Sequence, residues 1–207
     1  MIDIYSHLKM KDGARHTSLN QVEAEWLSEF VRQHKPRQTL EIGLAFGVSA
    51  VYIMSATGRV HYIIDPFVNS AIYQGYGLKN LARFGLKRNA KIFNEPSQLV
   101  LPRLLDKGLN FDFAFVDGSH FFDDQFVDFY FLDRLLKIGG HMIQHDAWTG
   151  PTKTLAAWIA TNKTNYQTVD SPQKTFNIWQ KTAVDKRKWF QFKKFKVTTT
   201  GKISSFI

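Results

Sequence analysis

The chain has 207 residues, of which 44% are hydrophobic and none is cysteine, and its formal net charge is +9. This length predicts one domain, and the lack of cysteine excludes disulfide frameworks, thiolate metal sites and cysteine nucleophiles. No stretch approaches the roughly 18 apolar residues that a transmembrane helix needs, and the N-terminus lacks the layout of a secretory signal. We therefore expect a soluble, cytoplasmic protein without a membrane span.

The positive charge is concentrated at the C-terminus. Residues 186–207 contain seven Lys or Arg and no Asp or Glu, whereas the rest of the chain is nearly neutral. We expect a single domain over residues 1–185, followed by a basic, aromatic-rich segment over residues 186–207. The alternation of aromatic and polar residues from Trp189 to Val197 predicts an edge strand. The alternative is an arm that binds nucleic acid through lysines and stacked aromatic rings.

Strands and helices alternate along most of the chain. The spacing of apolar residues predicts a first helix over residues 18–35, with Ser18 or Asn20 as its cap. We expect strands at 39–43, 60–64, 91–93, 111–116, 141–144, 166–169 and 176–180, and further helices at 47–56, 78–84, 96–105, 119–137 and 151–160. This order is typical of βαβ units and predicts an α/β fold, a doubly wound, mostly parallel Rossmann-like sheet with helices on both faces.

The first strand is followed by the sequence EIGLAFGVS, residues 41–49. Its two glycines, Gly43 and Gly47, let the backbone turn sharply and approach a ligand closely, and the N–H groups that open the next helix favour an anion. The second strand ends at Asp65, where a carboxylate can accept hydrogen bonds from both hydroxyls of a ribose. A tight turn with Asp65 as a helix cap is the alternative interpretation.

Two later strands each bring a carboxylate and an imidazole to the same edge of the predicted sheet. Asp117 and His120 follow the strand at 111–116, and His145 and Asp146 follow the strand at 141–144. Because the carboxyl ends of parallel strands meet at one edge, we expect these four side chains to converge. The alternative is that Asp117 or Ser119 only caps the long helix at 119–137.

These motifs together resemble a known family. The segments LEIGLAFGVSA (40–50), IIDPF (63–67), PSQLVLPRLLDKG (96–108), FDFAFVDGSHFFDDQFVDFYFLDRLLKIGG (111–140) and QHDAW (144–148) are similar to those of class I S-adenosylmethionine-dependent methyltransferases. The resemblance is strongest to a small bacterial O-methyltransferase-like group and weaker to the catechol O-methyltransferases. It covers residues 39–150, which we expect to form the cofactor core.

The resemblance implies S-adenosylmethionine as the cofactor and assigns roles to individual residues. His120 falls where the catechol enzymes carry a lysine base, Ala147 falls where they carry an asparagine ligand, and His145 falls where the bacterial group usually has an acid. The cofactor would contact Glu41, Gly43, Ala45, Gly47, Ser49, Asp65, Ser97, Gln98 and Asp117, and a divalent metal would be bound by Asp117, His145 and Asp146.

We therefore expect O-methylation of a small hydroxylated metabolite or sugar, with His120 as the general base. Asp117 and Asp146 would position the acceptor hydroxyl, directly or through a divalent ion. The alternative for His120 is that it only caps or packs the helix at 119–137. Two carboxylates suit Mg²⁺ or Ca²⁺, and a third ligand from His145 shifts the preference toward Mn²⁺, Fe²⁺ or Zn²⁺. The alternatives are an RNA methyltransferase that uses the basic segment, and a non-catalytic cofactor-binding module. Aromatic residues on more than one face of helix 119–137 leave a homodimer as a further hypothesis.

Overall fold

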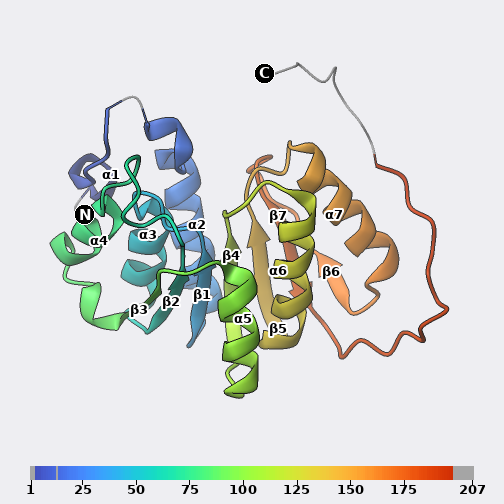
Figure 1. Cartoon of the computed structure of the whole chain (residues 1–207). Helices are drawn as coiled ribbons and strands as arrows, with labels where there is room; N and C mark the ends of the chain where they lie inside the picture. The colour runs from blue at the N-terminus through green and yellow to red at the C-terminus, as the bar shows by residue number, and fades with distance from the viewer. Residues whose placement is uncertain (1–2, 13, 198–207) are drawn as a thin grey trace.

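A computed structural model describes residues 3–12 and 14–197 of the chain. Seven strands form one sheet in the order β3-β2-β1-β4-β5-β7-β6 (Figure 1). The first five strands are parallel, and β7 runs antiparallel to both of its neighbours. The strands are β1 (Thr39–Ile42), β2 (His61–Ile64), β3 (Ala90–Phe93), β4 (Phe111–Val116), β5 (Leu136–Gln144), β6 (Tyr166–Thr168) and β7 (Asn177–Lys181).

Helices cover both faces of the sheet, and each face has its own apolar core. Helices α2 (Gln21–His34), α3 (Val48–Thr57) and α4 (Tyr76–Arg83) pack on one face, where Phe113 and Phe115 of β4 are buried. Helices α5 (Ser97–Asp106), α6 (Phe122–Leu135) and α7 (Gly150–Asn162) pack on the other face, where Leu40 and Ala114 are buried. The predicted doubly wound, mostly parallel sheet is confirmed. The described residues also form a short helix, α1 (Ile4–His7), and two 3-10 turns, η1 (Arg15–Thr17) and η2 (Lys87–Asn89).

Helix α2 illustrates how closely local sequence sets an element. The side chain of Asn20 accepts a hydrogen bond from the backbone N–H of Glu23, and the Glu23 carboxylate accepts one from the N–H of Asn20. This capping box satisfies two N–H groups that would otherwise lack a partner. Asn20, and not Ser18, is therefore the cap, and the helix ends at His34, just before Lys35 in the left-handed region.

The prediction for residues 136–140 is wrong. Helix α6 ends at Leu135, and β5 begins at Leu136, five residues earlier than expected. Leu136 pairs with Phe111 and His141 pairs with Phe113, so β5 carries extra residues in a bulge. Gly139, at φ +86°, occupies the left-handed region that such a bulge favours. The Gly139-Gly140 pair therefore lies inside a strand and does not end the helix.

The prediction of an edge strand in the C-terminal segment is also wrong as far as the structure describes it. Residues 186–197 contain no strand, and the sheet ends at β6 on that side. Residues 198–207 lie outside the described residues. No helix in the described part of the chain is long and apolar enough to cross a bilayer.

The sheet has a topological switch point between β1 and β4. The chain moves outward from β1 through β2 to β3 and then returns to place β4 on the other side of β1. Gly43 and Asp117, directly after these two strands, approach closely: a Cβ on Gly43 would lie 2.0 Å from the carbonyl oxygen of Asp117. Only glycine permits this contact, and ligands bind at such points in open α/β sheets.

Candidate active site

A cavity of about 700 Å³ opens at the switch point, at the carboxyl ends of the parallel strands. Loops that follow β1, β2, β4 and β5 contribute to its wall, together with the start of α5. Nine predicted site residues line it: Gly43, Ala45, Asp65, Ser97, Gln98, Asp117, His120, His145 and Asp146. Three others, Glu41, Gly47 and Ser49, do not.

Asp65 holds the loop that follows β1. One of its carboxylate oxygens, Oδ2, accepts hydrogen bonds from the backbone N–H groups of Leu44 (2.8 Å) and Ala45 (3.0 Å). The other, Oδ1, accepts one from the N–H of Phe67 (2.6 Å). Ala45 lies in the left-handed region at φ +45°, a strained conformation for alanine that these bonds stabilise. Asp65 is buried and borders the cavity.

Glu41 and Ser49 lie beneath the cavity and contact each other. The hydroxyl of Ser49 donates to one Glu41 oxygen, and His61 Nε2 lies 3.1 Å from the other. On its other side, the His61 ring contacts Thr39: His61 Nδ1 lies 2.8 Å from the Thr39 hydroxyl. All of these side chains are buried, and burial raises the pKa of Glu41. The structure thus places Glu41 and Ser49 as supports of the first strand and helix and not in the cavity wall.

Ser97 and Gln98 open helix α5 at the side of the cavity. The Gln98 amide donates to Asp124 Oδ1 at 2.8 Å, and the Ser119 hydroxyl donates to the other oxygen of Asp124 at 2.6 Å. This links the start of α5 to the loop after β4. Asp128 lies next to Ser97, and burial of its side chain raises the pKa of its carboxyl group to about 7.

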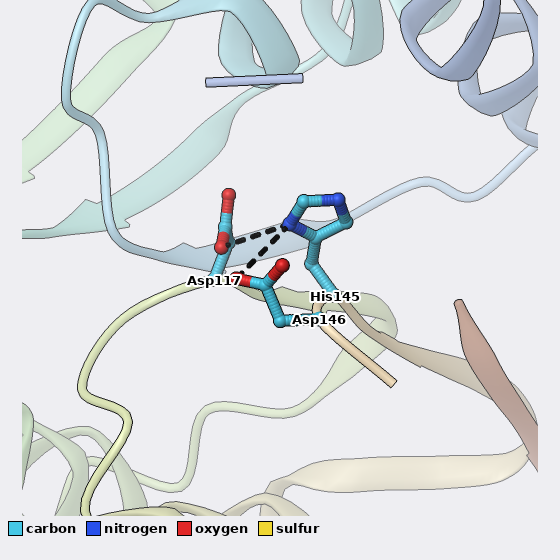
Figure 2. Close-up of side chains that lie close together, drawn as sticks. All are labelled: Asp117, His145 and Asp146. Atoms are coloured by element: carbon cyan, nitrogen blue, oxygen red, sulfur yellow. Dashed lines mark hydrogen bonds and ion pairs between the residues drawn. The ribbon is translucent and has the colours of Figure 1, made fainter. Parts of the chain in front are cut away.

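The two carboxylates and two imidazoles that the sequence singled out converge on the rim of the cavity. Figure 2 shows three of them, Asp117, His145 and Asp146, with the His145 ring directed toward the two carboxylates. His145 Nδ1 lies 3.2 Å from Asp117 Oδ1 and 3.6 Å from Asp146 Oδ2. His120 Nε2 lies 2.5 Å from Asp146 Oδ2, and the Trp148 indole donates to Asp146 Oδ1 at 2.9 Å. Asp146 has a positive φ of 54°, a conformation that occurs preferentially at functional sites in non-glycine residues.

His120 is not on a helix. Helix α6 begins at Phe122, with Phe121 as its cap residue, so both Asp117 and His120 lie in the loop between β4 and α6. The expectation that residues 119–121 are helical is wrong, because the Ser119 side chain forms hydrogen bonds that stabilise a loop before the helix. Its hydroxyl accepts from the N–H of Phe121 and donates to Asp124. The loop turns His120 toward Asp146.

The carboxylates control the protonation of both histidines. The hydrogen bond with Asp146 raises the pKa of His120 above its ordinary value of 6.5. Burial opposes the charged form of His145, but contacts with Asp117 and Glu23 outweigh it and raise the pKa to about 10. In the absence of another cation, His145 is therefore a buried imidazolium between acids.

Glu23 is the functional candidate that the sequence did not reveal. It comes from the first turn of α2, and its Oε1 lies 3.6 Å from His145 Nε2, a buried atom without a hydrogen-bond partner. The Thr175 hydroxyl donates to the same Glu23 oxygen at 2.6 Å. The only sequence signal at Glu23 is the capping box, which indicates the start of a helix and nothing more.

Asp117, His145 and Asp146 form a cluster that could hold a divalent metal ion. They offer two carboxylate oxygens and one ring nitrogen within 4.8 Å of one another. In metal sites a histidine ligand commonly directs its second ring nitrogen to a carboxylate. In His145, Nδ1 faces the two aspartates, and the second ring nitrogen, Nε2, faces the Glu23 carboxylate. Ala147 follows this cluster and offers no side-chain ligand.

The chain is similar to known methyltransferases. Residues 40–147, about half of the chain, match the family described as "Methyltransferase domain". The chain therefore belongs to this methyltransferase family, which confirms its resemblance to class I S-adenosylmethionine-dependent enzymes. No curated protein matches the chain in sequence.

Solved structures with the same fold are distant in sequence. The O-methyltransferase TomG from Streptomyces achromogenes, solved in complex with SAM, is 17% identical with a TM-score of 0.66, covering 87% of this chain and 96% of that one. A putative O-methyltransferase from Klebsiella pneumoniae is 12% identical with a TM-score of 0.68, covering 87% of each chain. An O-methyltransferase from Bacillus cereus, solved with SAH, is 15% identical with a TM-score of 0.67, also covering 87% of each chain. At these low sequence identities, the structural similarity shows that the chains share a fold and nothing more.

Proposed function

We propose that this enzyme transfers the methyl group of S-adenosylmethionine to a hydroxyl oxygen of a small molecule. The observation that carries the proposal is the convergence of His120, Asp146 and Asp117 at the rim of the cavity that Gly43 and Asp65 border. A cavity of about 700 Å³ suits a small ligand or cofactor. O-methyltransferases of the same fold bind SAM or SAH, which supports the cofactor and the reaction type.

The transfer is an in-line displacement at the methyl carbon. The acceptor oxygen forms a bond to this carbon while the bond from carbon to sulfur breaks, and the hydroxyl proton leaves for a base. A hydroxyl is a weak nucleophile until this proton is removed, so the protein must supply alignment and a proton acceptor.

His120 is the proposed proton acceptor. Its Nε2 is engaged with Asp146, so in the neutral ring Nε2 carries the hydrogen and Nδ1 is the free base. Asp146 thereby fixes the tautomer and stabilises the imidazolium that forms, as a carboxylate does for the histidine of a catalytic triad. Trp148 holds the other oxygen of Asp146 and fixes the carboxylate in turn.

Asp117, His145 and Asp146 are the proposed ligands of a divalent ion, with Glu23 as the outer partner of His145. Such an ion, when bound, would lower the pKa of the acceptor hydroxyl and orient it. His145 must be neutral to act as a ligand, so metal binding is expected to release its proton. The carboxylates then face the ion and not an imidazolium.

The test of the reaction compares His120→Ala with His7→Ala, a change at an exposed histidine on α1, outside the cavity. Formation of S-adenosylhomocysteine is measured with a panel of small hydroxylated acceptors. His120→Ala is expected to lower turnover about 10²–10⁴-fold, as loss of a general base does, with little change in cofactor affinity. Full turnover in a folded His120→Ala enzyme contradicts the base assignment, and turnover with RNA alone contradicts the acceptor class.

The test of the metal site is titration calorimetry with Mn²⁺ and Mg²⁺. Asp146→Asn is expected to abolish binding, and Glu23→Gln to weaken it about 10–100-fold, the usual effect of losing an outer-shell partner. Asp106→Asn, an exposed carboxylate at the end of α5, is the control. Turnover that is indifferent to a chelator, together with no measurable binding, means that the carboxylates act without an ion.

A further inference from the structure

The chain beyond β7 carries dense positive charge that the fold does not neutralise. We call residues 186–197 the C-terminal arm; it contains six Lys or Arg and no acid. Arg187 pairs with Asp185, just before the arm. The five lysines, by contrast, have no carboxylate partner among the described residues: Lys186, Lys188, Lys193, Lys194 and Lys196. The arm therefore presents uncompensated cations to its surroundings.

The same arm exposes large aromatic side chains. Trp189 is 94% exposed, Phe190 61% and Phe192 64%. Their ring contacts lie within the arm: Trp189 meets Phe190 at 5.6 Å between centroids, and Phe192 meets Phe195 at 6.4 Å. Scattered apolar residues are ordinary on a surface, but three such side chains within four positions form a patch that indicates a binding surface.

The arm runs past α7 (Figure 1), and side-chain contacts at two points attach it to that helix. Asn162 exchanges two hydrogen bonds with the backbone of Lys193, at 3.0 and 2.8 Å. Just before the arm, Asp185 pairs with the buried Lys163. Within the arm, Arg187 lies over the Trp158 ring at 5.7 Å from the centroid. These anchors fix the backbone of the arm and leave its aromatic rings and lysines turned outward.

We propose that the C-terminal arm binds the surface of an anionic phospholipid bilayer. Tryptophan and phenylalanine enter the boundary between headgroups and acyl chains, and nearby lysines bind lipid phosphates while their stems cover apolar surface. Both kinds of group occur here in one short, exposed segment, and the lysines complement the charge of an anionic leaflet. The attachment is peripheral and brings the enzyme to the membrane without a spanning segment.

Ring geometry favours a bilayer over single-stranded nucleic acid. Bases stack on the open faces of aromatic side chains. In the arm the rings of Trp189 and Phe190 meet at 89°, and those of Phe192 and Phe195 meet at 71°. Each pair therefore packs edge to face and forms an apolar wedge, not a row of parallel faces.

The test is co-sedimentation of the full chain with phosphatidylcholine vesicles, with and without phosphatidylglycerol. We expect binding only to the anionic vesicles, and weaker binding as salt screens the lysines. Replacing Lys193, Lys194 and Lys196 with Gln is expected to weaken binding about a hundredfold, at about fivefold for each lysine. The matched control replaces Lys87, Arg88 and Lys91 with Gln, exposed cations beside β3 at the opposite edge of the sheet.

The aromatic residues are tested separately from the charge. Lipids with a quencher on the acyl chain are expected to quench the fluorescence of the wild-type protein, and Trp189→Phe is expected to lose that quenching while still sedimenting. Equal binding to neutral and anionic vesicles, or equal loss in both lysine variants, overturns the proposal. Arm-dependent binding of a poly-uridine oligonucleotide without vesicle binding also overturns it and assigns the arm to nucleic acid.

Discussion

At the scale of single residues, Asp65 has a second role beyond the predicted one. The sequence places it at the end of β2 and predicts contacts with ribose hydroxyls. Its two oxygens accept hydrogen bonds from three backbone N–H groups, two of them in the loop after β1. The carboxylate thus supports this part of the cavity wall, and its loss would remove both the loop support and the predicted ligand contact.

Asp65→Ala is therefore expected to weaken S-adenosylmethionine binding. Loss of charge-assisted hydrogen bonds costs about 1.5–3 kcal/mol, or about tenfold to a hundredfold in affinity, and calorimetry measures it directly. Asp106→Ala, which removes an exposed acid from the end of α5, should bind normally. Undiminished affinity in a folded Asp65→Ala protein would remove Asp65 from the cofactor site.

The sequence predicts best the site residues that follow strands. Asp65 and Asp117 come directly after β2 and β4, and His145 and Asp146 come directly after β5. Parallel pairing alone brings such positions to one edge. Glu23 could not be found in this way. It reaches His145 from a helix early in the chain, through a tertiary contact between α2 and the end of β5. Glu41 and Ser49 share a motif with residues that line the cavity but do not line it themselves. Their side chains meet each other, and the Glu41 carboxylate also meets His61.

At the scale of elements, α2 and β5 meet through aromatic rings. His141 of β5 lies 4.3 Å from the His34 ring and 5.4 Å from the Phe30 ring of α2, between centroids. Burial, and then the neighbouring His34, lower the pKa of His141 to about 4. The folded protein therefore keeps this imidazole neutral at a pH where the unfolded chain, with a pKa near 6.5, has already protonated it.

The α2–β5 contact is accordingly expected to weaken in acid. The contribution of His141 is complete above pH 6.5 and is lost as the pH falls toward about 4, because the unfolded state then binds the extra proton. Between pH 7 and pH 5 this amounts to about 2 kcal/mol of the free energy of unfolding. Urea denaturation at both pH values measures this loss. In His141→Leu the free energy of unfolding should fall by that much less between pH 7 and pH 5, whereas His7→Leu should behave like the wild type. An unchanged pH dependence in His141→Leu would contradict this account.

Element prediction was accurate where apolar periodicity and caps agree, and failed where tertiary pairing decides. Strands β1, β2 and β4 and helix α2 lie within a few residues of their expected bounds. The sequence does not predict the start of β5, because a glycine pair after a helix is an ordinary stop signal. Only the pairing of Leu136 with Phe111 shows that the glycines form a bulge within a strand.

At the scale of the whole molecule, one edge of the sheet carries the proposed chemistry and a separate surface carries the arm. The cavity lies between the two cores at the switch point of β1 and β4, whereas the arm runs along α7 near β6 and β7 (Figure 1). A homodimer stays a prediction, with the exposed Phe121, Phe122 and Tyr130 of the α6 region as its candidate contacts. Separation of the two surfaces implies that the arm can be removed without damage to the cavity.

Deletion of residues 186–207 is expected to leave a folded protein that still binds S-adenosylmethionine. Among residues 186–197 it removes the two bonds between Asn162 and Lys193, the half-buried pair of Arg187 with Asp185, and the contact of Arg187 with the Trp158 ring. Together these are worth about 1–4 kcal/mol. An edge strand with its aromatic residues packed inward would instead contribute about 1.5–3 kcal/mol for each buried ring, and its loss would unfold most domains of this size.

Denaturant titration with calorimetric binding of the cofactor separates these outcomes. The matched control is a longer deletion, of residues 177–207, which also removes β7 from its place between β5 and β6 and is expected to unfold the chain. If the shorter deletion also unfolds it, the arm contributes more to the core than its exposed rings imply. Retained folding and cofactor affinity, with loss of vesicle binding alone, would establish the arm as an attachment to an independent catalytic domain.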